Sequence, residues 1–91
     1  FIYLYAQAFV EYAKSVDIDE TVARDLFAKS LIGSAKMITD SGKSLDELIE
    51  MVSSKGGTTI AGLEKLREGG LPKAVEDCCK ACTKRAYELS K

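Results

Sequence analysis

The feature that most constrains the fold of this chain is the spacing of its apolar residues. They recur every three or four positions, which places them on one face of an α-helix, and they do not alternate with the period of two that marks a strand. The clearest stripe lies in residues 1–15 and comprises Ile2, Tyr5, Ala6, Phe9, Ala13 and Val16. The sequence therefore predicts an all-α fold.

Residues that favour helix ends divide the chain into five predicted helices. Asp19 has the short acceptor side chain that N-caps favour, and Ser44 with Glu47 matches the reciprocal capping box. The other boundaries follow from backbone preferences of glycine and proline, at Gly42, Gly69, Gly70 and Pro72. The predicted helices cover residues 1–15, 20–41, 45 to 53 or 54, 59–68, and about 72–89.

The first two helices carry more apolar surface than one copy of the chain can cover. Tyr3, Val10 and Tyr12 make further faces of the first helix apolar, and such a helix is usually buried between neighbours. In the second helix, the small residues Gly33-Ser34-Ala35 would let another helix approach closely. We therefore expect a five-helix domain in which two copies interleave as a homodimer with an apolar interface.

Charge and composition exclude several classes of function. The net charge is −1 with both signs dispersed, so the chain lacks the basic surface of a nucleic-acid binder or of an anionic-lipid binder. No apolar run approaches the roughly 18 residues of a membrane span. We expect no nucleic-acid and no membrane partner. The start at Phe1 rather than Met suggests a piece of a longer protein.

The three cysteines, Cys78, Cys79 and Cys82, are clustered and odd in number. Such a set is not a disulfide framework and fits a reducing compartment, which predicts a cytoplasmic location. The C-x-x-C spacing of Cys79 and Cys82 falls inside a predicted helix, and three cysteines without histidine fall short of a zinc site. We predict small buried side chains here and no metal. Aromatic residues at helical spacing in the first helix are likewise predicted to be core: Tyr3, Tyr5, Phe9 and Tyr12.

The loop Ser53-Ser54-Lys55-Gly56-Gly57-Thr58-Thr59 separates the third and fourth predicted helices. The free N–H groups and dipole of a helix's first turn attract anions, glycines admit a ligand close to the backbone, and hydroxyls can donate to a carboxylate or phosphate. The alternative is a capped turn in which Thr58 or Thr59 serves only as N-cap. Neither G-x-G-x-x-G nor Gly-Lys-Ser/Thr after a strand occurs, so we predict no cofactor-binding residue in this chain.

The segment from Val52 to Leu63 resembles the signature segment of pyrroline-5-carboxylate reductases. The likeness extends in both directions: residues 33–37 are similar to that family's central dimerisation helix, residues 68–71 to its turn into the last helix, and residues 74–89 to that helix. The resemblance implies that residues 1–91 form a C-terminal dimerisation and substrate-binding domain. The Rossmann domain that holds the nicotinamide in this family would lie outside the chain.

The resemblance also implies an activity, the reduction of the cyclic imine 1-pyrroline-5-carboxylate to L-proline with NADPH or NADH. The partners it implies are a second copy of the chain, as a homodimer or a higher oligomer of dimers, and the small-molecule substrate. By position, the residues that would hold the substrate carboxylate are Ser54, Gly56, Gly57, Thr58 and Thr59. Thr59 would be catalytic, with its hydroxyl near the carboxylate or the ring nitrogen, and the proton would come from water or from this hydroxyl.

One residue departs from the family pattern. Lys55 stands where proline is common, which would make the loop less rigid. Its charge would either attract the carboxylate or remain solvated at the loop tip. The alternative function is a non-enzymatic all-α homodimerisation or interaction module, in which the loop is only a helix cap.

Overall fold

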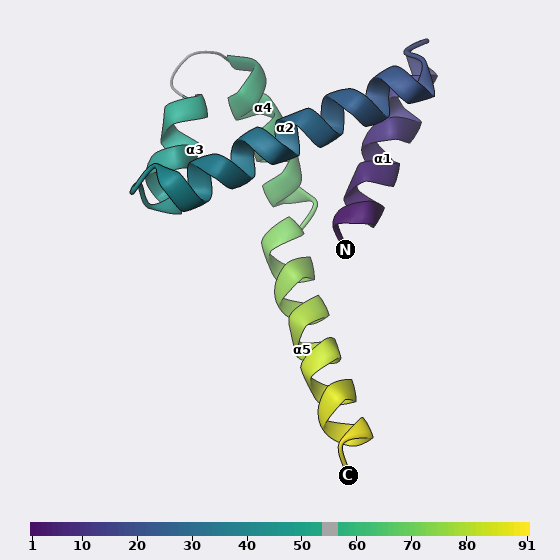
Figure 1. Cartoon of the computed structure of the whole chain (residues 1–91), viewed down its shortest axis with the longest axis vertical. Coiled ribbons are helices and arrows are strands. Elements are labelled where there is room, and N and C mark those ends of the chain that lie inside the picture. Colours follow the sequence, from purple (N-terminus) through teal and green to yellow (C-terminus); the bar gives the residue numbers. More distant parts are fainter. Residues whose placement is uncertain (54–56) are drawn as a thin grey trace. The chain divides into compact units, whose positions relative to one another are not determined.

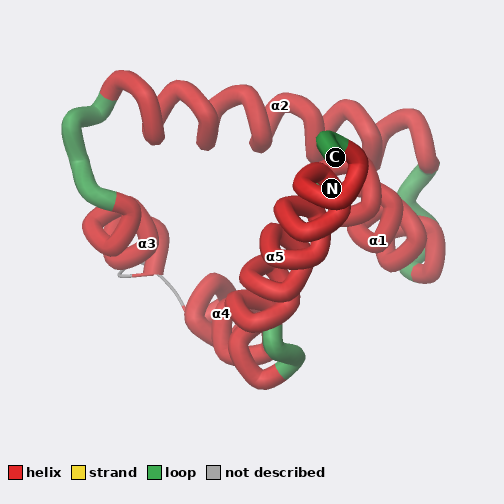
Figure 2. Tube along the Cα trace, turned by 90° about the horizontal axis from the view of Figure 1, so that it is seen from below, coloured by secondary structure: helices red, strands yellow, loops and turns green. Residues whose placement is uncertain are grey.

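The structure is a computed structural model that describes residues 1–53 and 57–91, and all regular secondary structure in these residues is helical (Figure 1, Figure 2). The helices are α1 (Ile2–Ser15), α2 (Glu20–Asp40), α3 (Leu45–Ser53), α4 (Gly57–Glu68) and α5 (Leu71–Leu89). The predicted all-α fold is confirmed. The chain divides into two compact units, Phe1–Leu48 and Ile49–Lys91, which are described separately.

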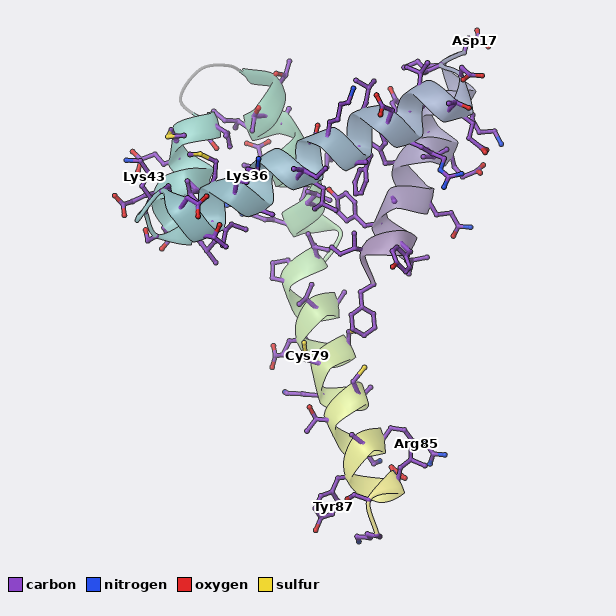
Figure 3. The ribbon with its side chains drawn as sticks, viewed as in Figure 1. Asp17, Lys36, Lys43, Cys79, Arg85 and Tyr87 are labelled. Atoms are coloured by element: carbon purple, nitrogen blue, oxygen red, sulfur yellow. The ribbon has the colours of Figure 1, made fainter. Side chains whose placement is uncertain are left out.

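The turn between α1 and α2 is closed by backbone hydrogen bonds around Asp17, which lies at the tip of the turn (Figure 3). The Asp17 N–H donates to the Lys14 carbonyl at 3.1 Å, and the Ile18 N–H donates to the Ala13 carbonyl at 2.9 Å. Asp17 has a φ of 66°, the left-handed conformation that ends many helices in this way. The chain therefore reverses direction over a few residues, which brings α2 back against α1.

The side-chain caps predicted from the sequence are confirmed. The Asp19 carboxylate accepts hydrogen bonds from the backbone N–H groups of Thr21 and Val22 at 3.0 and 3.3 Å. At α3, the Ser44 N–H donates to Glu47 Oε1 at 2.9 Å, and the Glu47 N–H donates to Ser44 Oγ at 3.1 Å. Each bond satisfies an N–H group that a helix start leaves without an intrahelical acceptor.

The glycine and proline boundaries also lie close to their predicted positions. α2 ends at Asp40, one residue earlier than predicted, and Gly42 follows with the left-handed φ of 72°. Gly69 and Gly70 separate α4 from α5, and Gly70 has a φ of 83°. Pro72 lies in the first turn of α5, where its missing N–H removes no intrahelical hydrogen bond.

The core of unit 1 lies where α1 packs against α2. Val10 and Ala13 of α1 and Ala23 of α2 are buried, with exposed fractions of 8, 2 and 0%. Two of these three side chains are alanine, so the backbones of the two helices approach closely. Val10 is buried although it does not belong to the predicted stripe. The direction from which α2 approaches decides which face of α1 is covered.

The aromatic residues of α1 divide into two pairs. The rings of Tyr5 and Phe9 lie 5.8 and 5.6 Å from the ring of Phe27 on α2, in tilted arrangements. Tyr3 and Tyr12 are exposed. Tyr5 and Phe9 also remain exposed, by 46 and 39%, although their rings contact Phe27. The prediction that all four are core is therefore wrong, because the described residues of unit 1 do not cover these faces.

In unit 2, no described residue is buried, although Leu63 and Cys78 are half-buried. The parts of α3, α4 and α5 in this unit that were predicted to face inward are largely exposed, including Ile49, Val52, Ile60, Leu66, Val75 and Leu89. Helical spacing decides which side chains share a face, but another element must lie against that face to bury it. The described residues of unit 2 leave these faces uncovered.

Candidate functional site

The candidate site lies at the first turn of α4. This helix begins at Gly57, two residues before the predicted start at Thr59. The interpretation of Thr58 or Thr59 as an N-cap is therefore wrong, since both residues lie inside the helix.

This start places the first described turn of α4 on the residues that the resemblance pointed to. Gly57, Thr58 and Thr59 lie in the first described turn of α4, the part of a helix whose N–H groups are directed toward its start. Three of the five predicted substrate-binding residues therefore lie together. The other two, Ser54 and Gly56, lie outside the described residues, as does Lys55.

The surroundings of this turn suit a small anion. Gly57 and Thr58 are exposed, Thr59 is half-buried, and the first turn contains no acidic residue. A Cβ atom added at Gly57 would meet nothing within 4 Å, so a ligand can come close to the backbone. Neither threonine side chain has a hydrogen-bond partner within the described part of the chain. The turn thus offers three amide donors and two hydroxyls at the positive end of a helix dipole.

The second feature that the sequence singled out is the cysteine cluster on α5. All three thiols are free, Cys78 is half-buried, and Cys79 and Cys82 are exposed. The prediction of buried side chains is therefore wrong for Cys79 and Cys82, because the described residues place no element against this part of α5. No group of three or more potential ligands among the described residues has the geometry of a metal site.

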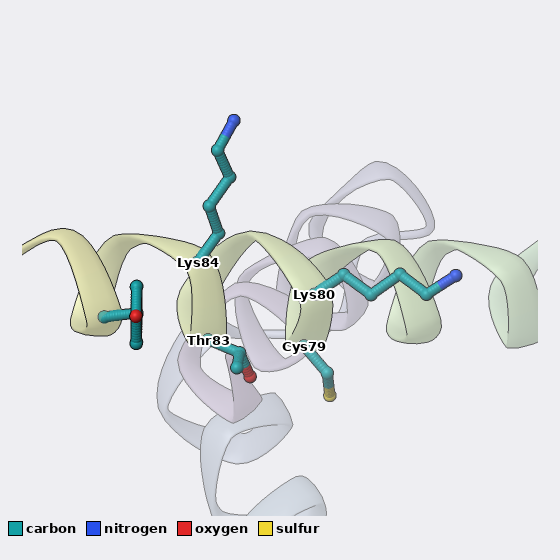
Figure 4. Close-up of a pocket in the computed structure, with 5 residues that line it drawn as sticks. Cys79, Lys80, Thr83 and Lys84 are labelled. Carbon is teal, nitrogen blue, oxygen red and sulfur yellow. The ribbon is translucent and has the colours of Figure 1, made fainter.

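A shallow depression on α5 is lined by residues of that helix alone (Figure 4): Cys79, Lys80, Thr83, Lys84 and Tyr87. Lys80 and Lys84 extend along and away from the helix, whereas Cys79 and Thr83 lie on another side of it. Because one helix supplies every wall, the depression does not enclose a ligand. The first turn of α4 remains the better candidate site.

Comparison with known proteins gives the site its context. The family model for pyrroline-5-carboxylate reductase dimerisation matches residues 1–89. The chain belongs to this pyrroline-5-carboxylate reductase family. It is 36% identical to pyrroline-5-carboxylate reductase 3 of Danio rerio over 89 residues, which is 98% of the chain and 31% of that protein. The pyrroline-5-carboxylate reductase of Pisum sativum is 36% identical over 90 residues, 99% of the chain and 33% of that protein.

A bacterial relative extends the family match across kingdoms. Pyrroline-5-carboxylate reductase 2 of Bacillus subtilis is 32% identical over 89 residues, 98% of the chain and 32% of that protein. The chain therefore spans about a third of the length of the curated reductases that it matches. No solved structure matches the chain. Among the described helices, none has both the length and the apolar character needed to cross a bilayer.

Proposed function

We propose that this chain is the dimerisation and substrate-binding domain of a longer, cytoplasmic pyrroline-5-carboxylate reductase, which reduces 1-pyrroline-5-carboxylate to L-proline with NADPH or NADH. The observation that carries the proposal is that Gly57, Thr58 and Thr59 form the first described turn of α4 in a chain of this family. The three free thiols support the reducing compartment.

The substrate carboxylate is the group that this turn would bind. Its charge suits the positive end of the α4 dipole, and the amides of Gly57 and Thr58 would donate charge-assisted hydrogen bonds to it. Thr59 is half-buried, so its hydroxyl would lie deeper, near the carboxylate or the ring nitrogen. Anchoring the carboxylate orients the ring, and this fixes the imine carbon for hydride transfer. The same hydroxyl, or a water molecule, would supply the proton to nitrogen.

The nicotinamide itself does not fit the residues of this chain. The sequence has no G-x-G-x-x-G segment between a strand and a helix, and the described residues contain no strand to support one. NADPH or NADH would therefore be held by the part of the reductase outside these residues. We predict that the isolated 91-residue chain has no NADPH-dependent turnover, and measurable turnover would contradict this assignment.

A homodimer would resolve the lack of a core. Only Val10, Ala13 and Ala23 are buried among the described residues, although 46% of the chain is hydrophobic. The exposed apolar side chains of α2 include Val22, Leu26, Leu31, Ile32, Met37 and Ile38. A Cβ atom at Gly33 would meet nothing within 4 Å, so no described residue makes the close helix approach that Gly33 permits. We propose that α1 and α2 of a second copy cover these faces by interleaving.

Light scattering of the 91-residue chain tests the homodimer. The expected mass is twice 9.9 kDa, and a monomer at micromolar concentration would rule out interleaving. Gly33→Leu should weaken the dimer by obstructing the approach of the partner helix. Gly62→Leu is the matched control, since Gly62 is also a helical glycine with nothing within 4 Å of an added Cβ atom. Equal effects of the two substitutions would contradict a close approach at Gly33.

Steady-state kinetics of the full-length reductase test the role of Thr59. Thr59→Ala should lower kcat/KM by roughly 10–100-fold, the range expected for loss of a hydrogen bond to a charged group, while the dimer remains intact. Thr39→Ala is the matched control, because the Thr39 hydroxyl bonds only to the carbonyls of its own helix, at Ala35 and Lys36. Unchanged kinetics for Thr59→Ala would refute the catalytic role of Thr59, whereas a full-length protein without reductase activity would favour a non-enzymatic dimerisation module.

A further inference from the structure

A groove on unit 1 is formed jointly by α1 and α2 and has a volume of about 410 Å³. Two apolar residues of α1 lie at its base, Ala6, which is half-buried, and Val10, which is buried. The phenol of Tyr3 and the amide of Gln7 also line it. Small-molecule sites typically have volumes of roughly 300–1,000 Å³ and combine apolar walls with a few polar groups. The groove therefore has the size and the lining of such a site.

The charged side chains of this groove are unevenly paired. Glu11 and Glu20 line it, and Lys14 pairs with both carboxylates, at 3.8 and 3.6 Å. Arg24 also lines the groove, but its guanidinium has no ion pair or hydrogen bond with another described residue. A guanidinium presents its N–H groups as a planar fork that matches the two oxygens of a carboxylate. The unpaired cation therefore favours a ligand that carries a carboxylate.

The groove lies away from the face of α2 that we assign to a second copy of the chain. Arg24 and Gly33 are nine positions apart within Glu20–Asp40, so at 3.6 residues per turn they lie on opposite sides of the helix. Charged residues such as Glu20 and Arg24 are also depleted at the centres of protein interfaces. A homodimer that forms through Gly33 would therefore leave the groove open to a small molecule.

We propose that this groove binds a small carboxylic acid with an apolar body. The carboxylate pairs with the Arg24 guanidinium, and the body of the ligand lies on Ala6 and Val10 beside the ring of Tyr3. Lys14 offsets the charge of the two glutamates, which reduces their repulsion of the ligand. The proposal does not depend on the reductase function, because no residue of α4 takes part in it.

An NMR titration of the ¹⁵N-labelled chain with 3-phenylpropanoate at pH 7 tests the site. We expect chemical-shift changes centred on residues 3–11 and 20–24, with a dissociation constant of roughly 1–10 mM for a ligand of this size in an open groove. The neutral amide, 3-phenylpropanamide, is the matched probe and should bind more weakly. Equal affinities for the acid and the amide would overturn the pairing with Arg24.

Arg24→Gln should weaken binding of 3-phenylpropanoate at least about 10-fold, as expected for loss of a hydrogen bond between charged groups. Arg67→Gln is the matched control, because Arg67 is an exposed arginine of α4 that also has no ion pair with another described residue. Equal effects of the two substitutions would contradict the proposal. Shift changes centred on Gly57–Thr59 that survive Arg24→Gln would place the carboxylate at α4, which would overturn this site and leave the proposed reductase function intact.

A substitution at the base of the groove tests the place of the apolar body. Ala6→Leu should fill the space above Val10 and abolish binding, while the circular dichroism of the parent chain is retained. Ala8→Leu, at an exposed position of the same helix, is the matched control and should leave the affinity unchanged. An Ala6→Leu variant that binds 3-phenylpropanoate with the parent affinity would overturn the proposal.

Discussion

Ser44 and Glu47 exchange hydrogen bonds at the start of α3. The Ser44 N–H donates to the Glu47 carboxylate at 2.9 Å, and the Glu47 N–H donates to the Ser44 hydroxyl at 3.1 Å. The hydrogen bonds from the Ser44 backbone and hydroxyl hold the pKa of Glu47 below its ordinary value. Both residues are exposed, so this effect depends on local geometry and not on burial.

The capping box makes the free energy of unfolding of the chain depend on pH in the acidic range. Because the pKa of Glu47 is lower in the folded state, its contribution to stability is full above the ordinary value of 4.5 and is lost as the pH falls below it. Glu47→Gln should remove this part of the acid dependence, as seen in unfolding midpoints measured across that range. Glu50→Gln, which removes a carboxylate of the same helix outside the capping box, is the comparison variant. If the two variants have identical pH profiles, the capping box has no such role.

Asp17 is a residue at which glycine should improve stability. Its φ of 66° is left-handed, a conformation that disfavours residues with a Cβ atom. Asp17→Gly should therefore raise the free energy of unfolding by about 1 kcal/mol, as measured by urea denaturation at fixed protein concentration. Gly42→Ala, at a φ of 72°, is the reciprocal test and should lower the free energy of unfolding by a similar amount. A loss of stability in Asp17→Gly would contradict the turn geometry.

Ala23 is the most sensitive position in the contact between α1 and α2. It is completely buried against α1, so Ala23→Leu should force the helices apart and lower the free energy of unfolding by about 1–3 kcal/mol. Ala28→Leu, on an exposed part of the same helix, should change it by less than about 0.5 kcal/mol. Chemical denaturation of both variants provides the measurement. Equal effects would mean that Ala23 is not in the core.

Gly57→Ala separates the binding role of the α4 turn from a capping role. Gly57 is helical and has open space around it, so alanine should stabilise the helix by roughly 0.5–1 kcal/mol. The added methyl group should nevertheless lower kcat/KM of the full-length reductase, because it occupies space that the substrate carboxylate needs. Thermal unfolding and steady-state kinetics on the same variant test both expectations. A more stable enzyme with unchanged kinetics would favour the simple cap.

The helix ends were predictable because their causes are local. Asp19 and Ser44 cap backbone groups two or three residues away, and Gly42 takes a conformation that depends on its own missing Cβ atom. The start of α4 was predicted two residues late because the Gly56-Gly57 pair was treated as part of the loop. Glycine is disfavoured within a helix, but that penalty does not exclude it from a first turn, and the structure places Gly57 there.

Burial could not be predicted in the same way, because it depends on which surfaces meet. The apolar spacing of α1 indicated one main stripe with further apolar faces, and only the packing of α2 distinguished the buried Val10 and Ala13 from the exposed Tyr3 and Tyr12. The order of residues thus determined the five helices and their caps, whose interactions span a few positions. The tertiary structure alone decided which faces are covered, since long-range contacts select among faces that are equally apolar.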